Sequence, residues 1–130
     1  MNRLAMVAVL VPDYDQGIRF FSEALGFELV TDEDQGRKRW VVMQGDGGVR
    51  VLLARAEGDQ RATIGHQFGG RVGLFLETGD IARQRQQMEA VGVVFEEPTR
   101  HEPYGSVAVF RDPWGNRWDL IEPKTKAPSS

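Results

Sequence analysis

The chain has 130 residues, of which 41% are hydrophobic and 27% are charged, and its formal net charge at pH 7 is −3. This length suits one domain, and the balance of apolar and charged residues excludes wholesale disorder. The negative charge argues against a nucleic-acid-binding protein, and no apolar run approaches the roughly 20 residues that a membrane span needs.

Two further counts limit the chemistry of the chain. The sequence contains no cysteine and only two histidines, His66 and His101. A disulfide, a thiolate metal site and a cysteine nucleophile are therefore excluded, and imidazole, the commonest ligand of transition metals, is scarce. No export signal is recognisable near the first residue, so we expect a cytoplasmic protein.

The first half of the chain predicts one helix and four strands. The apolar run at residues 6–11 is typical of a buried strand. Asp13 can cap the following helix, whose apolar side chains recur at helical spacing until Gly26 ends it. Further strands are expected at 27–30, 39–43 and 49–54, with a polar turn over 32–36 and a loop over 57–70.

The second half repeats this order. A strand is expected at 72–76, a helix between a capping Asp80 and a terminating Gly92, and strands at 93–95, 106–110 and 117–121. Residues 98–103 look irregular, 112–116 form a turn, and 124–130 are a polar tail.

The spacing of equivalent landmarks supports a tandem repeat. The two capping aspartates are 67 positions apart, and the two helix-ending glycines are 66 apart. We therefore predict an α+β fold of two βαβββ units, over about residues 4–56 and 70–123, within one domain spanning 1–130. Each half is too small to hold a core alone, so we expect the two to pack together.

Three segments carry a resemblance to a known family. They read VPDYDQGIRFFSEALGFEL at 11–29, VGVVF at 91–95 and FRDPWGNRWDLIEP at 110–123. These segments resemble the vicinal oxygen chelate superfamily, which includes glyoxalase I, bleomycin-resistance proteins and extradiol dioxygenases. The resemblance implies that the units form a curled mixed-sheet cup, with both helices outside and a ligand or metal inside. It also implies a homodimer, because a second chain often completes such cups.

The resemblance places the four metal-ligand positions of the family at Met6, Leu52, Arg71 and Asp119. A thioether, an alkyl chain and a guanidinium do not hold a hard or borderline cation, and one carboxylate is not a site. We therefore predict no metal site and no cofactor, with a divalent metal disfavoured. Arg71 and Asp119 are expected to form an ion pair, unless Arg71 stays free for an anionic ligand. Alternatively, the pair merely neutralises an inherited polar cup.

Strand alternation and the family register predict the other side chains inside the cup. An aromatic ring there can stack on a planar ligand, although an aromatic that simply fills space explains Trp40 equally well. His101 and Tyr104 lie in the stretch that borders the cup mouth in this family, where a histidine is an acid–base candidate or is merely solvated. The predicted ligand-binding residues are Met6, Trp40, Leu52, Arg71, Phe75, His101, Tyr104, Val109 and Asp119.

These observations favour a metal-independent protein that binds a small molecule in its cup, as in the bleomycin-resistance branch. The alternative is a glyoxalase- or dioxygenase-type enzyme, a lyase or oxidoreductase with a non-standard or absent metal site. Two further possibilities are a metal-free lyase or isomerase that uses Arg71, Asp119 or His101, and an accessory protein that acts mainly through dimerisation.

Overall fold

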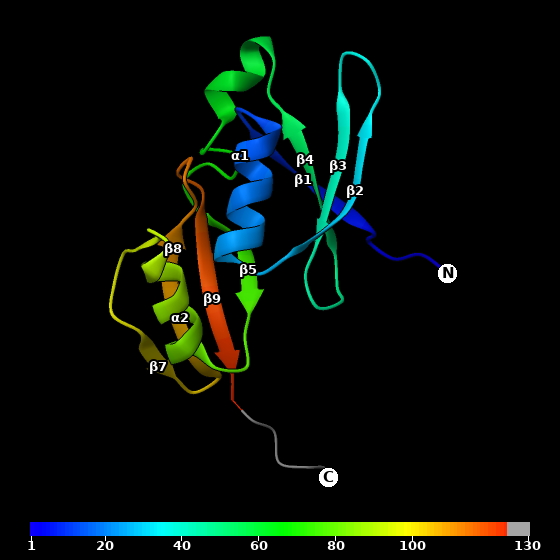
Figure 1. Cartoon of the computed structure of the whole chain (residues 1–130). Helices are drawn as coiled ribbons and strands as arrows, with labels where there is room; N and C mark the ends of the chain where they lie inside the picture. Colours follow the sequence, from blue (N-terminus) through cyan, green and yellow to red (C-terminus); the bar gives the residue numbers. More distant parts are fainter. Residues whose placement is uncertain (125–130) are drawn as a thin grey trace. The chain divides into compact units, whose positions relative to one another are not determined.

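The computed structural model describes residues 1–124, and the chain divides into two compact units, Met1–Gln67 and Phe68–Ser130. Each unit contains a mixed sheet and a helix, which confirms the predicted α+β fold (Figure 1). Of the predicted polar tail over 124–130, only Lys124 lies within the described residues. No helix in residues 1–124 is long and apolar enough to cross a membrane.

Unit 1 contains a four-stranded sheet in the order β1-β4-β3-β2. The β1–β4 pair is parallel, and the other two pairs are antiparallel. The helix α1 continues directly as a π-helical turn, η1, and a short 3₁₀ helix, η2, follows the last strand. The elements are β1 (Met6–Val11), α1 (Tyr14–Arg19), η1 (Phe20–Ala24), β2 (Glu28–Asp34), β3 (Arg39–Gln44), β4 (Arg50–Arg55) and η2 (Gly58–Thr63).

Unit 2 repeats this arrangement with one added strand. Its sheet has the order β5-β9-β8-β6, with β7 also paired to β8, and the β5–β9 pair is parallel. The elements are β5 (Val72–Glu77), α2 (Ile81–Ala90), β6 (Val94–Phe95), β7 (Arg100–Glu102), β8 (Gly105–Arg111) and β9 (Arg117–Pro123).

The predicted helix boundaries are confirmed in both units. The Asp13 carboxylate accepts a hydrogen bond from the backbone N–H of Gln16 at 2.9 Å, and Asp80 accepts one from Arg83 at 3.1 Å. These bonds satisfy backbone donors that the first helical turn leaves without a partner. Gly26 has φ +72°, and the predicted glycine after α2 is also left-handed, so each helix ends in a conformation that favours glycine.

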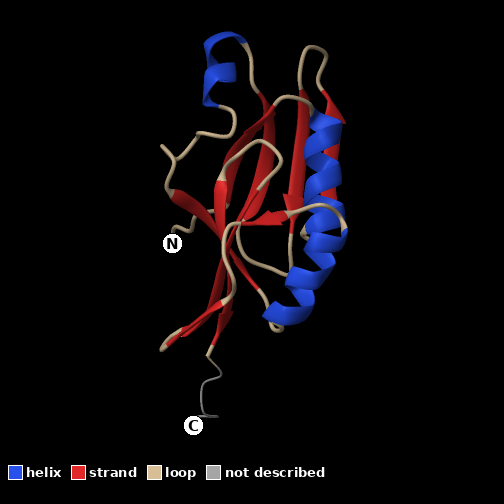
Figure 2. Ribbon diagram, turned by 90° about the vertical axis from the view of Figure 1, so that its left-hand side faces the viewer, coloured by secondary structure: helices blue, strands red, loops and turns tan. Residues whose placement is uncertain are grey.

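One face of each sheet forms the core of its unit beneath the helix (Figure 2). In unit 2 the buried Phe110 and Trp118 stack with ring centroids 5.5 Å apart, so both rings belong to the core of this unit. Alternation along each strand leaves the other sheet face uncovered by the helix of that unit. The buried residues of these two cores, from the strands and from the helices, include Val9, Phe21, Val41, Met43, Leu53, Met88, Ala108 and Leu120.

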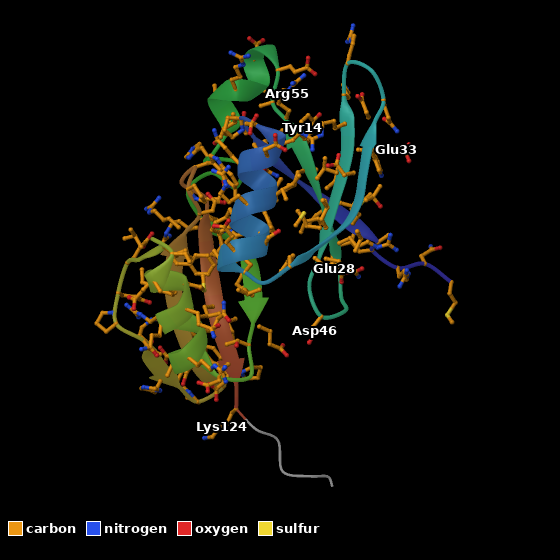
Figure 3. The ribbon with its side chains drawn as sticks, in the orientation of Figure 1. Tyr14, Glu28, Glu33, Asp46, Arg55 and Lys124 are labelled. Carbon is orange, nitrogen blue, oxygen red and sulfur yellow. The ribbon has the colours of Figure 1, made fainter. Side chains whose placement is uncertain are left out.

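An arginine–tyrosine stack joins the start of α1 to two strands of unit 1. The guanidinium carbons of Arg39 and Arg55 lie 5.2 and 5.4 Å from the centre of the Tyr14 ring, and the Tyr14 hydroxyl accepts the backbone N–H of Arg39 at 3.2 Å. Figure 3 shows Tyr14 and Arg55 close together at one end of the sheet. Cation–π contacts and a satisfied hydroxyl therefore fix the helix at this end.

The predicted turn over 32–36 is wrong, because β2 continues through Asp34 and the chain turns only over 35–38. The reason is a cross-strand ion pair that pattern alone does not reveal. The guanidinium of Arg39, on β3, donates to Asp32 at 2.7 and 3.1 Å, so these polar residues extend the ladder.

Two segments expected to be irregular contain regular structure. Within 57–70, Glu57 and Gln60 form a reciprocal capping box that starts η2. Within 98–103, β7 pairs with β8, and Arg100 binds Glu97 at 2.7 Å and Glu102 at 2.6 Å. Neither segment has the apolar periodicity that signals a helix or a strand, because ion pairs and caps rather than buried side chains hold it.

Candidate functional site

The sheet face of unit 2 that α2 does not cover, here called the open face of unit 2, holds three of the predicted ligand-binding residues in one row. Phe75 on β5 pairs with Asp119 on β9, and Asp119 pairs with Val109 on β8. Directly paired residues of neighbouring strands point to the same side of a sheet. Phe75 is 63% exposed, whereas Val109 is buried, so the row offers a free ring, a carboxylate and an apolar floor.

Asp119 lacks the partners that a partly buried carboxylate usually has. Its Oδ1 is buried and makes no hydrogen bond to any residue in 1–124. Burial raises the pKa of the Asp119 carboxyl, Arg100 and Arg117 act in the opposite direction, and Glu97 adds to the rise. The group is therefore an acceptor whose hydrogen-bonding capacity is unused within the described chain.

The two arginines near Asp119 are bound to other carboxylates. Arg100 is held by Glu97 and Glu102, as described above, and Arg117 donates to the two carboxylate oxygens of Glu96 at 3.0 and 3.1 Å. Each guanidinium is thus largely neutralised by a closer carboxylate. This geometry explains why Asp119 has arginines nearby yet no ion pair.

The predicted ion pair between Arg71 and Asp119 does not form within residues 1–124. Arg71 is exposed and precedes β5, which begins at Val72. The residue of β5 beside Asp119 is Phe75, four residues further on, which corresponds to about 13 Å along a strand. The resemblance put Arg71 and Asp119 in the same cup, but the strand pairing puts Phe75 rather than Arg71 beside Asp119.

The open face of unit 1, the sheet face away from α1, carries three more of the predicted residues. Leu52 on β4 lies between Ala8 on β1 and Val42 on β3, so this row is apolar from edge to centre. Met6 lies two residues before Ala8 on β1, and Trp40 two residues before Val42 on β3. Trp40 is 39% exposed, so this face also presents an aromatic ring.

His101 and Tyr104 lie in the β7–β8 hairpin, away from the row that contains Asp119. His101 pairs with Ser106, and its Nδ1 lies 2.8 Å from the Ser106 Oγ. Ser106 in turn pairs with Glu122. By alternation this pair points to the same sheet face as the core residues Phe110 and Trp118, which is the face opposite Asp119. Tyr104 is exposed at the hairpin tip. Within unit 2 the structure therefore does not bring these two side chains to Asp119.

The residues at the four family metal positions do not fit a metal ion. They supply a thioether from Met6, an alkyl chain from Leu52, a cation from Arg71 and one carboxylate from Asp119. Nowhere in the part of the chain that the structure describes do three His, Cys, Asp or Glu side chains gather as a metal would require. The donor chemistry of this chain thus differs from that of metal-dependent members.

Two features of the open face of unit 2 were not predicted. The first is a cluster in which the Glu96 carboxylate binds both Arg117 and Arg111, with the Arg111 Nε 2.8 Å from the Glu96 Oε2. The alternating charges in the sequence give no reliable signal for this cluster. The second is the ring of Phe68, which lies so close to Gly73 that a Cβ there would overlap it. Glycine inside a strand is a recognisable sign of such a close approach.

Replacing Glu96 by glutamine is expected to lower the free energy of unfolding by about 1 kcal/mol at pH 7. Hydrogen bonds from Arg117 are the main cause that lowers the pKa of Glu96, and the ion-paired side chains are only partly exposed. Because the pKa of Glu96 is lower in the folded than in the unfolded protein, its ion pairs contribute their full stability at pH values above the unfolded-state pKa of about 4.3. This contribution disappears as the pH falls through the folded-state pKa.

Urea unfolding over a series of pH values from 7 downward checks this expectation, because the difference between the wild type and Glu96→Gln should shrink as Glu96 becomes protonated. Glu28→Gln is the control, since Glu28 is exposed and makes no ion pair within residues 1–124. An equal loss in the control, or a difference that does not shrink as the pH falls, contradicts this account of the cluster.

Comparison with known proteins places this geometry in a family. A sequence profile described as Glyoxalase/Bleomycin resistance protein/Dioxygenase superfamily matches residues 3–120. An uncharacterised protein of Shewanella frigidimarina is 45% identical over 127 residues, covering 94% of each chain. The profile match covers most of the chain, and the relative is similar over nearly its whole length.

Solved structures agree with this assignment. TnmS3, described as an antibiotic binding protein from Streptomyces sp. CB03234, superposes with a TM-score of 0.77 at 25% identity, over 95% of this chain and 98% of its own. UcmS2 superposes with a TM-score of 0.79 at 28% identity, over 93% and 98%. The chain belongs to the glyoxalase/bleomycin resistance protein/dioxygenase superfamily.

Proposed function

We propose that this protein binds a planar, largely apolar small molecule without the help of a metal ion. The observation that carries the proposal is the exposed ring of Phe75 in a row with Asp119 and Val109, on a sheet face that its own helix leaves open. An exposed aromatic beside an apolar floor and one polar group is the composition that small-molecule sites commonly have. The ring supplies a stacking surface, and Val109 supplies the floor.

Two further observations support this proposal. The donor set at the family metal positions, described above, is unsuited to divalent cations, so the residues favour binding over metal-assisted chemistry. TnmS3, which shares the fold over 95% of this chain, is described as an antibiotic binding protein. We therefore propose a sequestering role of the bleomycin-resistance type, in which the ligand is held rather than transformed. The family resemblance also supports a homodimer, which the molecular mass from light scattering tests.

Replacing Phe75 by serine is expected to weaken the binding of planar aromatic probes about tenfold, because the stacking surface is lost. The probes are 2-naphthol and 2-methoxynaphthalene, and the measurement is an NMR titration in the presence of EDTA. Phe75 is largely exposed, so the variant should keep the stability of the wild type.

Val91→Ser is the matched control, since Val91 is also an exposed apolar residue of unit 2 but follows α2 rather than lying on the open face. The proposal predicts that this variant binds both probes as the wild type does. Unchanged binding by Phe75→Ser, or equal weakening in both variants, would show that the open face of unit 2 is not the binding surface.

A further inference from the structure

We propose that the ligand of the open face of unit 2 carries an O–H or N–H group, and that Asp119 accepts a hydrogen bond from it beside the Phe75 ring. This inference rests on the proposed function and specifies the chemistry that the site selects. It assigns Asp119 a role as a hydrogen-bond acceptor for the ligand.

The first argument is the unused bonding capacity of Asp119. A carboxylate can accept about four hydrogen bonds, and the buried Oδ1 of Asp119 receives none from residues 1–124. Asp112, the buried aspartate of the neighbouring turn, is by contrast bonded through both oxygens. Because a buried polar atom without a partner is costly, a ligand that donates to the Asp119 Oδ1 gains a hydrogen bond that residues 1–124 do not supply, and a ligand without a donor gains none.

The second argument is the charge around the row. The guanidinium groups of Arg100 and Arg117 are bound to glutamates at 2.6 to 3.1 Å, so they are not available to an anionic ligand. Along β5, Glu77 follows Phe75 on the same face and makes no ion pair within the described residues. The unpaired charges beside the ring are therefore carboxylates, which attract donors and repel anions.

The third argument is the geometry of the row. Phe75 and Val109 are the direct strand neighbours of Asp119 on either side, so the carboxylate stands between an exposed ring and a buried valine. A planar molecule stacked on Phe75 would bring a substituent at its edge over the carboxylate. The structure thus selects molecules that combine an aromatic ring with a donor at the ring edge.

A pair of matched probes tests this inference. 2-Naphthol and 2-methoxynaphthalene share one ring system, and only the first can donate a hydrogen bond, while 2-naphthoate adds a negative charge. NMR titrations in EDTA should give a dissociation constant for 2-naphthol about tenfold lower than for 2-methoxynaphthalene. Binding of 2-naphthoate should be weaker than that of either neutral probe.

Variants at the carboxylate separate its role from general packing. Asp119→Leu replaces both carboxylate oxygens by methyl groups on the same branched skeleton, and it should abolish the preference for 2-naphthol while leaving 2-methoxynaphthalene bound. Asp119→Asn retains an acceptor oxygen and should keep part of the preference. Glu77→Gln is the control for a non-specific effect of charge, and it should keep the full preference because 2-naphthol is neutral.

The outcomes distinguish this inference from the proposed function. If both neutral probes bind the wild type equally, or if Asp119→Leu keeps the preference, the role of Asp119 is overturned while small-molecule binding stands. If 2-naphthoate binds more tightly than the two neutral probes, the proposed role of Asp119 is overturned and a cationic subsite is favoured instead. If no probe binds, both the inference and the proposed function fail.

Discussion

Replacing Asp112 by alanine is expected to destabilise the protein by about 3–5 kcal/mol, the largest effect that we predict for a single side chain. Asp112 is buried in the turn between β8 and β9. Its Oδ1 accepts the backbone N–H groups of Trp114, Gly115 and Asn116 at 3.1, 2.9 and 2.9 Å. Its Oδ2 accepts hydrogen bonds from the Asn116 amide at 3.0 Å and the Trp118 indole at 3.1 Å.

The cost arises because alanine removes these five hydrogen bonds in a region from which water is largely excluded. The Gly115 N–H also donates to the backbone oxygen of residue 112 at 3.1 Å, and alanine keeps that bond. The Trp118 indole stacks on Phe110, so the loss extends from the turn into the core of unit 2. Urea unfolding followed by tryptophan fluorescence and circular dichroism measures the effect.

Asp112→Asn is the matched control for this prediction. It keeps one oxygen for the backbone donors but turns an amide NH₂ toward two other donors, so its loss should be intermediate. A change of less than 1 kcal/mol in Asp112→Ala would contradict the view that this carboxylate organises the turn.

Replacing Gly105 by alanine is expected to cost about 3 kcal/mol, the second largest effect. Gly105 has φ +149°, and a Cβ at this position would overlap the backbone oxygen of Glu122 and lie 3.0 Å from the Cα of Pro123. Backbone atoms of a paired strand cannot move aside as a flexible side chain can. The β8–β9 pairing must therefore open at the β7–β8 hairpin to accept the methyl group.

Gly36→Ala isolates the contribution of the backbone dihedral. Gly36 has φ +86°, but a Cβ there meets no atom within 4 Å, so only the conformational cost of about 1–2 kcal/mol applies. Comparison of the two unfolding free energies measures the steric contribution. Equal losses in the two variants would show that the close approach of β8 and β9 at Gly105 is unimportant.

Most of the fold could be predicted from the sequence, because its signals are local. The apolar run at 6–11 gave a strand with the observed bounds, and the capping aspartates with their terminating glycines fixed both helices. The repeat of these signals predicted the βαβββ order twice. By contrast β7 and η2 are held by ion pairs and a capping box, and residue periodicity does not report such contacts.

The candidate site was only partly predictable, for a related reason. Strand alternation for Phe75, and the family resemblance for Val109 and Asp119, predicted side chains on one face, and the strand pairing places these three in one row. Neither signal could show that Arg71 lies before β5 and away from Asp119, because the start of a strand and the register of its partner depend on long-range pairing. They also could not reveal that Arg100 and Arg117 bind glutamates, which leaves Asp119 as the unpartnered group.

The most direct test of the central proposal is the dissociation constant of 2-naphthol before and after removal of divalent metals. The protein is titrated as purified, then after exhaustive dialysis against EDTA, and again after addition of Zn²⁺, Ni²⁺, Mn²⁺ or Fe²⁺. A metal-independent binding protein gives the same dissociation constant in all three states. Binding that is lost on chelation and restored by one of these ions would contradict the proposal and favour the metal-dependent chemistry of other family members.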